Sequence, residues 1–280
     1  MFLLAMRSTA VLVLLAVPIF AGDKPNTYLA LGDSVAFGYD PTLIKPGSPL
    51  PKPDQFTGYP EVVAQIEAAK YAINAGCPGQ TSKSFLLGGW DDNGCEGFRN
   101  SIGLHTTYTG TQDEFALSQL TGNKKIGLVT LSIGGNDLLL LQQRCAPPAN
   151  FEVCVTLGLP DVLATYGKNL AQILFNIRYR ANYKGTLVIV NSYTPSANPL
   201  FITAVGALNL VMVKAGLPFG VKFADAFTAF RLASGLSGDP CKAGLIIPLG
   251  NGTCDVHPTK RGRTLIAAAV AFAIHAGPFN

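Results

Sequence analysis

The sequence predicts an α/β protein, a three-layer α/β/α sandwich with a mostly parallel central sheet. Short runs of β-branched and other apolar residues alternate along the chain with longer segments of helical periodicity. The short runs lack the polar–apolar alternation of a half-exposed strand, which is typical of parallel strands buried on both faces. Strands that alternate with helices favour one layered domain built around such a sheet.

Five runs are the candidate strands. Residues 28–31, 126–133 and 186–191 are the strongest, because each is a continuous stretch dominated by apolar residues. Residues 71–74 and 221–224 are weaker candidates of the same kind. Parallel pairing of these runs requires that helices connect them.

Three segments between and after these runs have helical periodicity. A helix is expected over residues 60–70, where a proline and a glutamate occupy the first turn. A second is expected to begin at Pro160, and a third follows Pro258 and ends before Gly277. The apolar segment 201–213 is also expected to be a helix of the core.

Composition limits the class of protein. A chain of 280 residues fits one large α/β domain, and with 48% hydrophobic and only 14% charged residues it has the means to build a core. The net charge of +4 is small, and the lysines and arginines form no basic stripe with interleaved aromatic residues. We therefore expect no nucleic-acid partner.

The N-terminal segment predicts secretion. Arg7 precedes an apolar run over residues 11–17, which Pro18 and three further apolar residues follow, with a possible cleavage site after Ala21. This is the pattern of a signal peptide over residues 1–21, although a retained anchor is the alternative. The run is short for a membrane span, which needs about 20 apolar residues. The remaining residues, 22–280, are expected to form a single domain.

Six cysteines agree with an extracellular location. They form three close pairs along the chain, which favours bridges between neighbours, although other connectivities stay open. The favoured bridges are Cys77 with Cys95, Cys145 with Cys154, and Cys241 with Cys254. The spacing does not match a zinc site, so no metal is expected.

The segment Gly32-Asp33-Ser34 follows the first expected strand. A strand that stops at a glycine presents the next side chains at the carboxyl edge of the sheet. A serine hydroxyl there needs a base to take its proton before it can act as a nucleophile. Ser34 is the candidate nucleophile, and Asp33 is expected to brace the turn through hydrogen bonds.

Of the three histidines, His257 is the best candidate base, because Asp255 precedes it by two residues. His105 lies in a polar loop with no obvious partner. His275 ends an apolar helix and is expected to cap the last carbonyls.

An oxyanion intermediate also needs hydrogen-bond donors, and Asn136 supplies a side-chain amide at the end of the strongest strand.

These segments resemble the SGNH (GDSL) hydrolase family of secreted lipases and esterases. Four blocks match in order, and the resemblance spans residues 28–275. The blocks are Gly32-Asp33-Ser34, Asn74-x-Gly76-x-x-Gly79-x-Thr81, Gly134-x-Asn136-Asp137 and Asp255-x-His257-Pro258. The resemblance implies a flavodoxin-like SGNH hydrolase fold, and the three-disulfide layout is similar to that of secreted actinobacterial esterases of this family.

The resemblance also implies a role for each block. Ser34 is the nucleophile, and its own N–H, the N–H of Gly79 and the side-chain amide of Asn136 form the oxyanion hole. His257 is the base. The family's commoner spacing is Asp-x-x-His, whereas this chain has Asp255 two residues before the histidine, so either Asp255 or a backbone carbonyl orients the ring.

The expected activity is that of a secreted serine esterase or lipase, which hydrolyses small-molecule or lipid acyl esters without a cofactor. A carbohydrate acetylesterase and a non-catalytic surface binding module are the alternatives. We expect a monomer that contacts a lipid interface.

Loops 40–59 and 85–111 are expected to border the site. If residues 201–213 line an acyl groove, Leu208 and Leu210 are the side chains expected to set chain-length preference.

Overall fold

The computed structural model describes residues 25–276 except residues 90, 124, 147 and 148. The expected signal peptide, residues 1–21, lies outside the described residues. Five parallel strands form the central sheet in the order β2-β1-β3-β4-β5, which is the flavodoxin-like order. The strands are β1 (Thr27–Gly32), β2 (Tyr71–Asn74), β3 (Ile126–Ser132), β4 (Thr186–Val190) and β5 (Lys222–Ala224). All five lie at the predicted positions.

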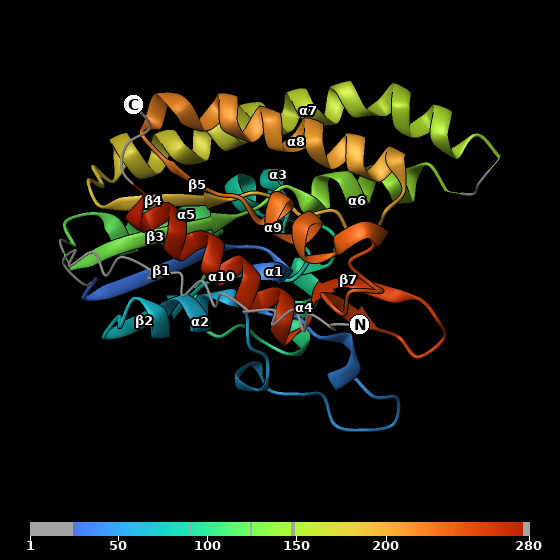
Figure 1. Ribbon diagram of the computed structural model, residues 1–280. Helices are drawn as coiled ribbons and strands as arrows, with labels where there is room; N and C mark the ends of the chain where they lie inside the picture. The colour runs from blue at the N-terminus through green and yellow to red at the C-terminus, as the bar shows by residue number, and fades with distance from the viewer. Residues whose placement is uncertain (1–24, 90, 124, 147–148, 277–280) are drawn as a thin grey trace, which may run out of the picture.

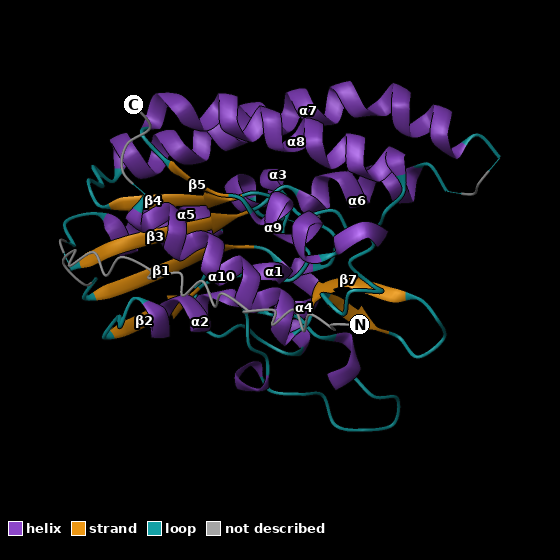
Figure 2. Ribbon diagram, viewed as in Figure 1, coloured by secondary structure: helices purple, strands orange, loops and turns teal. Residues whose placement is uncertain are grey.

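Helices cover both faces of this sheet (Figures 1 and 2). One layer contains α1 (Ser34–Phe37), α2 (Tyr59–Ile66), α9 (Ala226–Ala233) and α10 (Lys260–His275). The other contains α3 (Ser82–Leu87), α5 (Gln112–Leu120), α7 (Phe151–Phe175) and α8 (Pro199–Gly216). The three-layer architecture is therefore confirmed.

Two hydrophobic cores lie on opposite faces of the sheet. Leu29 and Leu31 of β1 pack into the α3/α5/α7/α8 side, whereas Tyr28 and Ala30 pack against the α2/α9/α10 side. Because successive strand residues point to opposite faces, a strand buried on both faces must be apolar throughout. This explains why the sequence predicted the strands well.

Several elements stand outside the two main layers. A two-stranded antiparallel hairpin, β6 (Ile246–Pro248) and β7 (Cys254–Pro258), lies beyond the carboxyl ends of the main strands. The remaining α-helices are α4 (Cys95–Ser101) and α6 (Gly135–Arg144). Short turns are the 3₁₀ segments Pro41–Leu43, Pro53–Gln55, Leu217–Phe219 and Gly235–Ser237, and a π segment, Asn176–Arg180.

Two helix boundaries were predicted wrongly. The helix expected over residues 60–70 ends at Ile66, and Ala68 adopts a left-handed conformation with φ of 50°. The helix expected to begin at Pro160 begins at Phe151, with Pro160 in its interior. Proline removes one helical hydrogen bond, but Pro160 and Thr156, whose carbonyl loses its partner, are both exposed to solvent. The first turns are instead held by apolar packing onto α6.

All three expected disulfides form, between Cys77 and Cys95, Cys145 and Cys154, and Cys241 and Cys254. The first joins the β2–α3 loop to the start of α4. The second joins the end of α6 to the first turn of α7, and the third joins the hairpin to the segment before it. Residues 85–111, expected to be an irregular loop, contain helix α4.

The segment Pro199–Phe219 has a mean hydropathy of 1.9 and is long and apolar enough, by composition alone, to cross a membrane. In the fold it packs along α7 (Figure 1). Leu208 and Met212 are fully buried in the core beneath it. As predicted, this helix packs one face into the core, although only 28% of its apolar window is buried.

Candidate active site

Ser34 is the first residue of α1, directly after β1. Asp33 caps this helix, and its Oδ1 accepts a hydrogen bond from the Val35 N–H at 3.0 Å. Gly32 has φ of +139°, and a Cβ there would lie 2.0 Å from the Ser132 carbonyl oxygen. Only glycine fits at this position, so the tight strand-to-helix turn is dictated by sequence. Asp33 braces the turn as predicted.

A buried glutamine from α5 also holds this turn. Gln112 Oε1 accepts from the Gly32 N–H at 2.5 Å, and Gln112 Nε2 donates to the Gly32 carbonyl at 3.0 Å. The side-chain amide thus pairs with both polar groups of Gly32, as a neighbouring strand would. Sequence reasoning missed Gln112, because 80 residues separate it from its partner.

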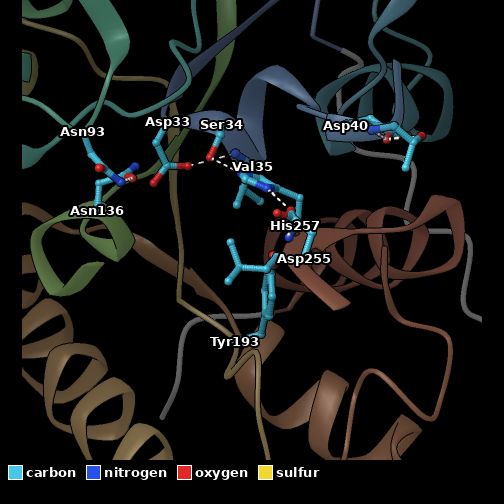
Figure 3. Close-up of polar contacts among 11 residues, drawn as sticks. Asp33, Ser34, Val35, Asp40, Asn93, Asn136, Tyr193, Asp255 and His257 are labelled. Carbon is cyan, nitrogen blue, oxygen red and sulfur yellow. Dashed lines mark hydrogen bonds and ion pairs between the residues drawn. The ribbon is translucent and has the colours of Figure 1, made fainter. Parts of the chain in front are cut away.

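The structure brings Ser34, His257 and Asp255 together (Figure 3). His257 Nε2 lies 2.7 Å from Ser34 Oγ. On the other side of the ring, Nδ1 contacts Asp255 Oδ1, which also accepts from the His257 N–H at 3.0 Å. A carboxylate, and not a backbone carbonyl, therefore contacts Nδ1. Both residues lie on strand β7, just before the last helix.

The contacts between Asp255 and His257 favour an ionised Asp255 carboxylate. Partial burial acts to raise the pKa of Asp255, but the hydrogen bonds and charge of His257 outweigh it, so the pKa lies below its ordinary value. The pKa of Asp33 is shifted in the opposite direction. Burial, with a contribution from nearby Asp137, raises the pKa of Asp33 to about 7.

Two tyrosines support the histidine strand. Tyr193 donates from its hydroxyl to the Val256 carbonyl at 2.6 Å, and its ring stacks on Phe230 with centroids 4.1 Å apart. The Tyr39 ring packs edge-on against the His257 ring, with the ring centroids 4.8 Å apart. Tyr39 directly precedes the loop 40–59. Neither tyrosine was singled out from the sequence.

Asn136 lies in the first turn of α6, after β3, and lines the same cavity as Ser34 and His257. Its Nδ2 donates to the Gln80 carbonyl at 3.1 Å. Since an amide carries two N–H groups, the second is available to a ligand. Gly79, with φ of +88°, precedes Gln80 in the loop that Asn136 contacts.

Hydrogen bonds tie the blocks to one another. Asp137 accepts from the Ser82 hydroxyl at 2.6 Å and from the Ser82 N–H at 3.0 Å, which fixes α6 to the start of α3. Asn74 Nδ2 donates to the Ala36 carbonyl at 2.8 Å, which fixes the end of β2 to the serine helix. Asp137 thus has a structural role.

A cavity of about 120 Å³ opens beside Ser34 and His257. Its far walls are apolar and come from three helices. They include Leu138 and Leu141 of α6, Val155 and Leu159 of α7, and Phe201, Ala204 and Val205 of α8.

The segment 201–213 therefore contributes to a cavity wall through its first turns. The expectation for Leu208 and Leu210 was wrong. Leu208 is fully buried in the core behind the wall, and Leu210 is 55% exposed on the outer face of α8. With about 3.6 residues per turn, Leu208 lies on the same helix face as Ala204 and Val205 but one turn further along, in the core, whereas Leu210 lies on the opposite face.

The other two histidines are engaged elsewhere. His105 Nε2 lies 2.9 Å from the Phe37 carbonyl oxygen, and its ring packs on that of Phe37. His275 Nε2 lies 3.1 Å from Oε2 of Glu67, the residue directly after α2. The expectation that His275 caps the carbonyls of its own helix was wrong, because the nearly buried Glu67 carboxylate provides a stronger, charged acceptor.

Solved structures that share this fold include a phospholipase, a lipase and an acetylxylan esterase. Phospholipase A1 from Streptomyces albidoflavus superimposes with a TM-score of 0.59 and 18% identity, covering 89% of this chain and 99% of that enzyme. An extracellular lipase from Streptomyces rimosus has a TM-score of 0.57 and 19% identity, covering 89% of this chain and 99% of the lipase. Acetylxylan esterase from Geobacillus stearothermophilus has a TM-score of 0.53 and 15% identity, covering 90% of this chain and 95% of the esterase. At these identities the likeness concerns the fold.

No curated protein matches the chain at a significant level in sequence. The sequence model of the GDSL-like lipase/acylhydrolase family, however, matches residues 30–265. This match includes the serine turn, the two glycine-rich junctions and the histidine strand. The chain therefore belongs to the GDSL-like lipase/acylhydrolase family.

Proposed function

We propose that the protein is a secreted serine esterase that hydrolyses carboxylic esters with apolar acyl chains. The observation that supports this most is the hydrogen-bonded series Asp255–His257–Ser34 at the edge of an apolar cavity. A serine paired in this way with a histidine that is itself oriented by a carboxylate is the arrangement that acyl transfer requires.

In the proposed reaction, Ser34 Oγ attacks the ester carbonyl carbon while His257 Nε2 takes the hydroxyl proton. Asp255 accepts from Nδ1–H and so keeps Nε2 free to act as base. The N–H groups of Ser34 and Gly79 and the Asn136 amide stabilise the oxyanion. The intermediate expels the alcohol, which takes its proton from His257. Water then attacks the acyl-enzyme by the same route and releases the acid.

The cavity lining favours an acyl chain over a polar group. Leucine, valine and phenylalanine side chains cover the walls beyond the catalytic residues, and burial of each CH₂ is worth about 0.8 kcal/mol. An acetyl group, as in a carbohydrate acetylesterase, would leave most of this surface unused. We therefore favour longer acyl esters.

Ala204→Phe tests the acyl site together with the activity itself. We expect saturable hydrolysis of nitrophenyl esters, with wild-type kcat/KM rising from acetate to medium-chain esters. The larger side chain fills the cavity, so kcat/KM should fall about tenfold or more for the longer esters and little for acetate. The exposed Leu210→Phe is the control and should leave the profile unchanged. Equal losses at every chain length would contradict the acyl site, and no hydrolysis of any ester would contradict the function.

The three disulfides support secretion, since such bonds persist in oxidising compartments. The signal-like residues 1–21 agree with this. We propose that the secreted enzyme acts as a monomer.

We also propose contact with a lipid interface through the start of α7. Val153 and Leu157 are 58% and 74% exposed, and they alternate with Val155 and Leu159, which line the cavity. A double variant, Val153→Ser with Leu157→Ser, should lower the rate on esters in phospholipid vesicles about fivefold or more, because it removes roughly 1–3 kcal/mol of apolar insertion. The rate on soluble acetate esters should not change. Leu236→Ser is the exposed control away from the cavity, and an equal loss for that variant would reject the contact.

A further inference from the structure

We infer that Asn93 is a positioning residue for the oxyanion hole, and that it aims the Asn136 amide at the ester carbonyl. The inference rests on the proposed function, because it assigns a role through one of the proposed donors. Asn93 lies in the loop before α4, 43 residues from Asn136 in sequence, and outside the four family blocks. Figure 3 shows the two side chains in contact.

Three hydrogen bonds in series fix the orientation of both amides. Gln143 Nε2 donates to Asn93 Oδ1 at 2.8 Å, and Asn93 Nδ2 donates to Asn136 Oδ1 at 2.9 Å. Asn136 Nδ2 then donates to the Gln80 carbonyl at 3.1 Å. A backbone carbonyl can only accept, so the direction of the whole series is set at that end.

A rotated Asn136 amide would lose both contacts. Its oxygen would face the Gln80 carbonyl oxygen, and its NH₂ would face the Asn93 NH₂. Asn136 is only 4% exposed, so water could not readily compensate. With Oδ1 held by Asn93, the amide plane is fixed and the second N–H of Nδ2 keeps one direction. A fixed donor needs no reorganisation when charge develops on the substrate.

The same residue also holds the second proposed donor. The Asn93 N–H donates to the Gly79 carbonyl at 2.8 Å. The approach is close, since a Cβ on Gly79 would lie 2.3 Å from the Asn93 carbonyl oxygen. The Cys77–Cys95 disulfide joins residues two positions before Gly79 and two positions after Asn93. Asn93 therefore connects the backbone donor and the side-chain donor.

A double-mutant cycle tests this role. In the full-length enzyme, Asn136→Ala should lower kcat about 10²-fold or more on a soluble ester. Asn93→Ala should lower kcat about tenfold with KM changed less than about twofold, because the loss concerns the transition state. The double variant should be no slower than Asn136→Ala alone, since Asn93 acts through Asn136. Asn100→Ala, an exposed asparagine on α4, is the control and should keep wild-type kcat.

Additive losses, or wild-type kcat in Asn93→Ala, would overturn the inference. Wild-type activity in Asn136→Ala would also overturn it and leave ester hydrolysis standing, whereas an inactive wild-type enzyme would reject the proposed function itself.

A charged variant adds a second measurement, the pH dependence of kcat, which would not change if Asn93 had only a structural role. In Asn93→Asp, the carboxylate would face Asn136 Oδ1 and repel it, whereas the protonated acid could donate to it as the native amide does. The ratio of variant to wild-type kcat should therefore rise severalfold as the pH falls from neutral toward the range in which a carboxyl is protonated. A constant ratio would contradict the positioning role.

Discussion

Replacing Ser34 or His257 by alanine lowers kcat for ester hydrolysis about 10⁴- to 10⁶-fold, if these residues act as a nucleophile–base pair. Ser34 Oγ is the atom that would bond to the acyl carbon, and His257 Nε2, 2.7 Å away, would take its proton. Without the hydroxyl no acyl-enzyme can form, and without the ring the hydroxyl keeps its proton. The measurement is kcat on a soluble nitrophenyl ester, with Tm recorded for each variant.

The double variant, Ser34→Ala with His257→Ala, should be no slower than either single variant, because one function is lost in all three. Ser118→Ala, exposed on α5, is the matched serine control and should retain wild-type kcat. Loss of less than about tenfold in a folded Ser34→Ala protein would contradict the assignment of the nucleophile.

Asp255→Asn is expected to lower kcat about 10³- to 10⁴-fold with KM nearly unchanged. The carboxylate contacts His257 Nδ1. An amide in its place could donate to Nδ1, which would put the ring proton on Nε2 and leave Ser34 facing a donor instead of a base. The lowered pKa of Asp255 keeps it ionised at neutral and mildly acidic pH. Loss of kcat/KM on acidification should therefore not come from this carboxylate.

Asp255→Ala serves as the comparison, since it removes the acceptor without adding a donor. We expect it to be impaired less than the asparagine variant. If kcat of both variants stays within about fivefold of the wild-type value, another group orients the His257 ring and the Asp255 carboxylate is dispensable.

Much of the fold could be predicted because β1, β3 and β4 are apolar on both faces, and that pattern is local. Prediction failed where tertiary contacts override local preference. Pro160 is tolerated inside α7 because its turn is exposed to solvent while packing onto α6 holds the helix start. The β6–β7 hairpin was missed because three apolar residues at Ile246–Pro248 are too few to show a period.

The chemical groups of the site could be recognised from short local blocks, but their supports could not. Gln112 and Tyr193 contact residues 80 and 63 positions away, and nothing in their own neighbourhood marks them. The choice between Asp255 and a backbone carbonyl also needed coordinates, because spacing alone does not say which acceptor faces Nδ1. Leu208 and Leu210 were misassigned because an apolar segment does not reveal which turn faces a cavity.

Covalent labelling with an alkyl phosphonate ester tests the central claim most directly, since the reagent bonds to an activated serine and mimics the tetrahedral intermediate. Peptide mapping by mass spectrometry should find one adduct per chain, on the peptide that contains Ser34, and none in the Ser34→Ala variant. The label should form far more slowly in His257→Ala. Stoichiometric inactivation with the adduct on any other residue would contradict the account.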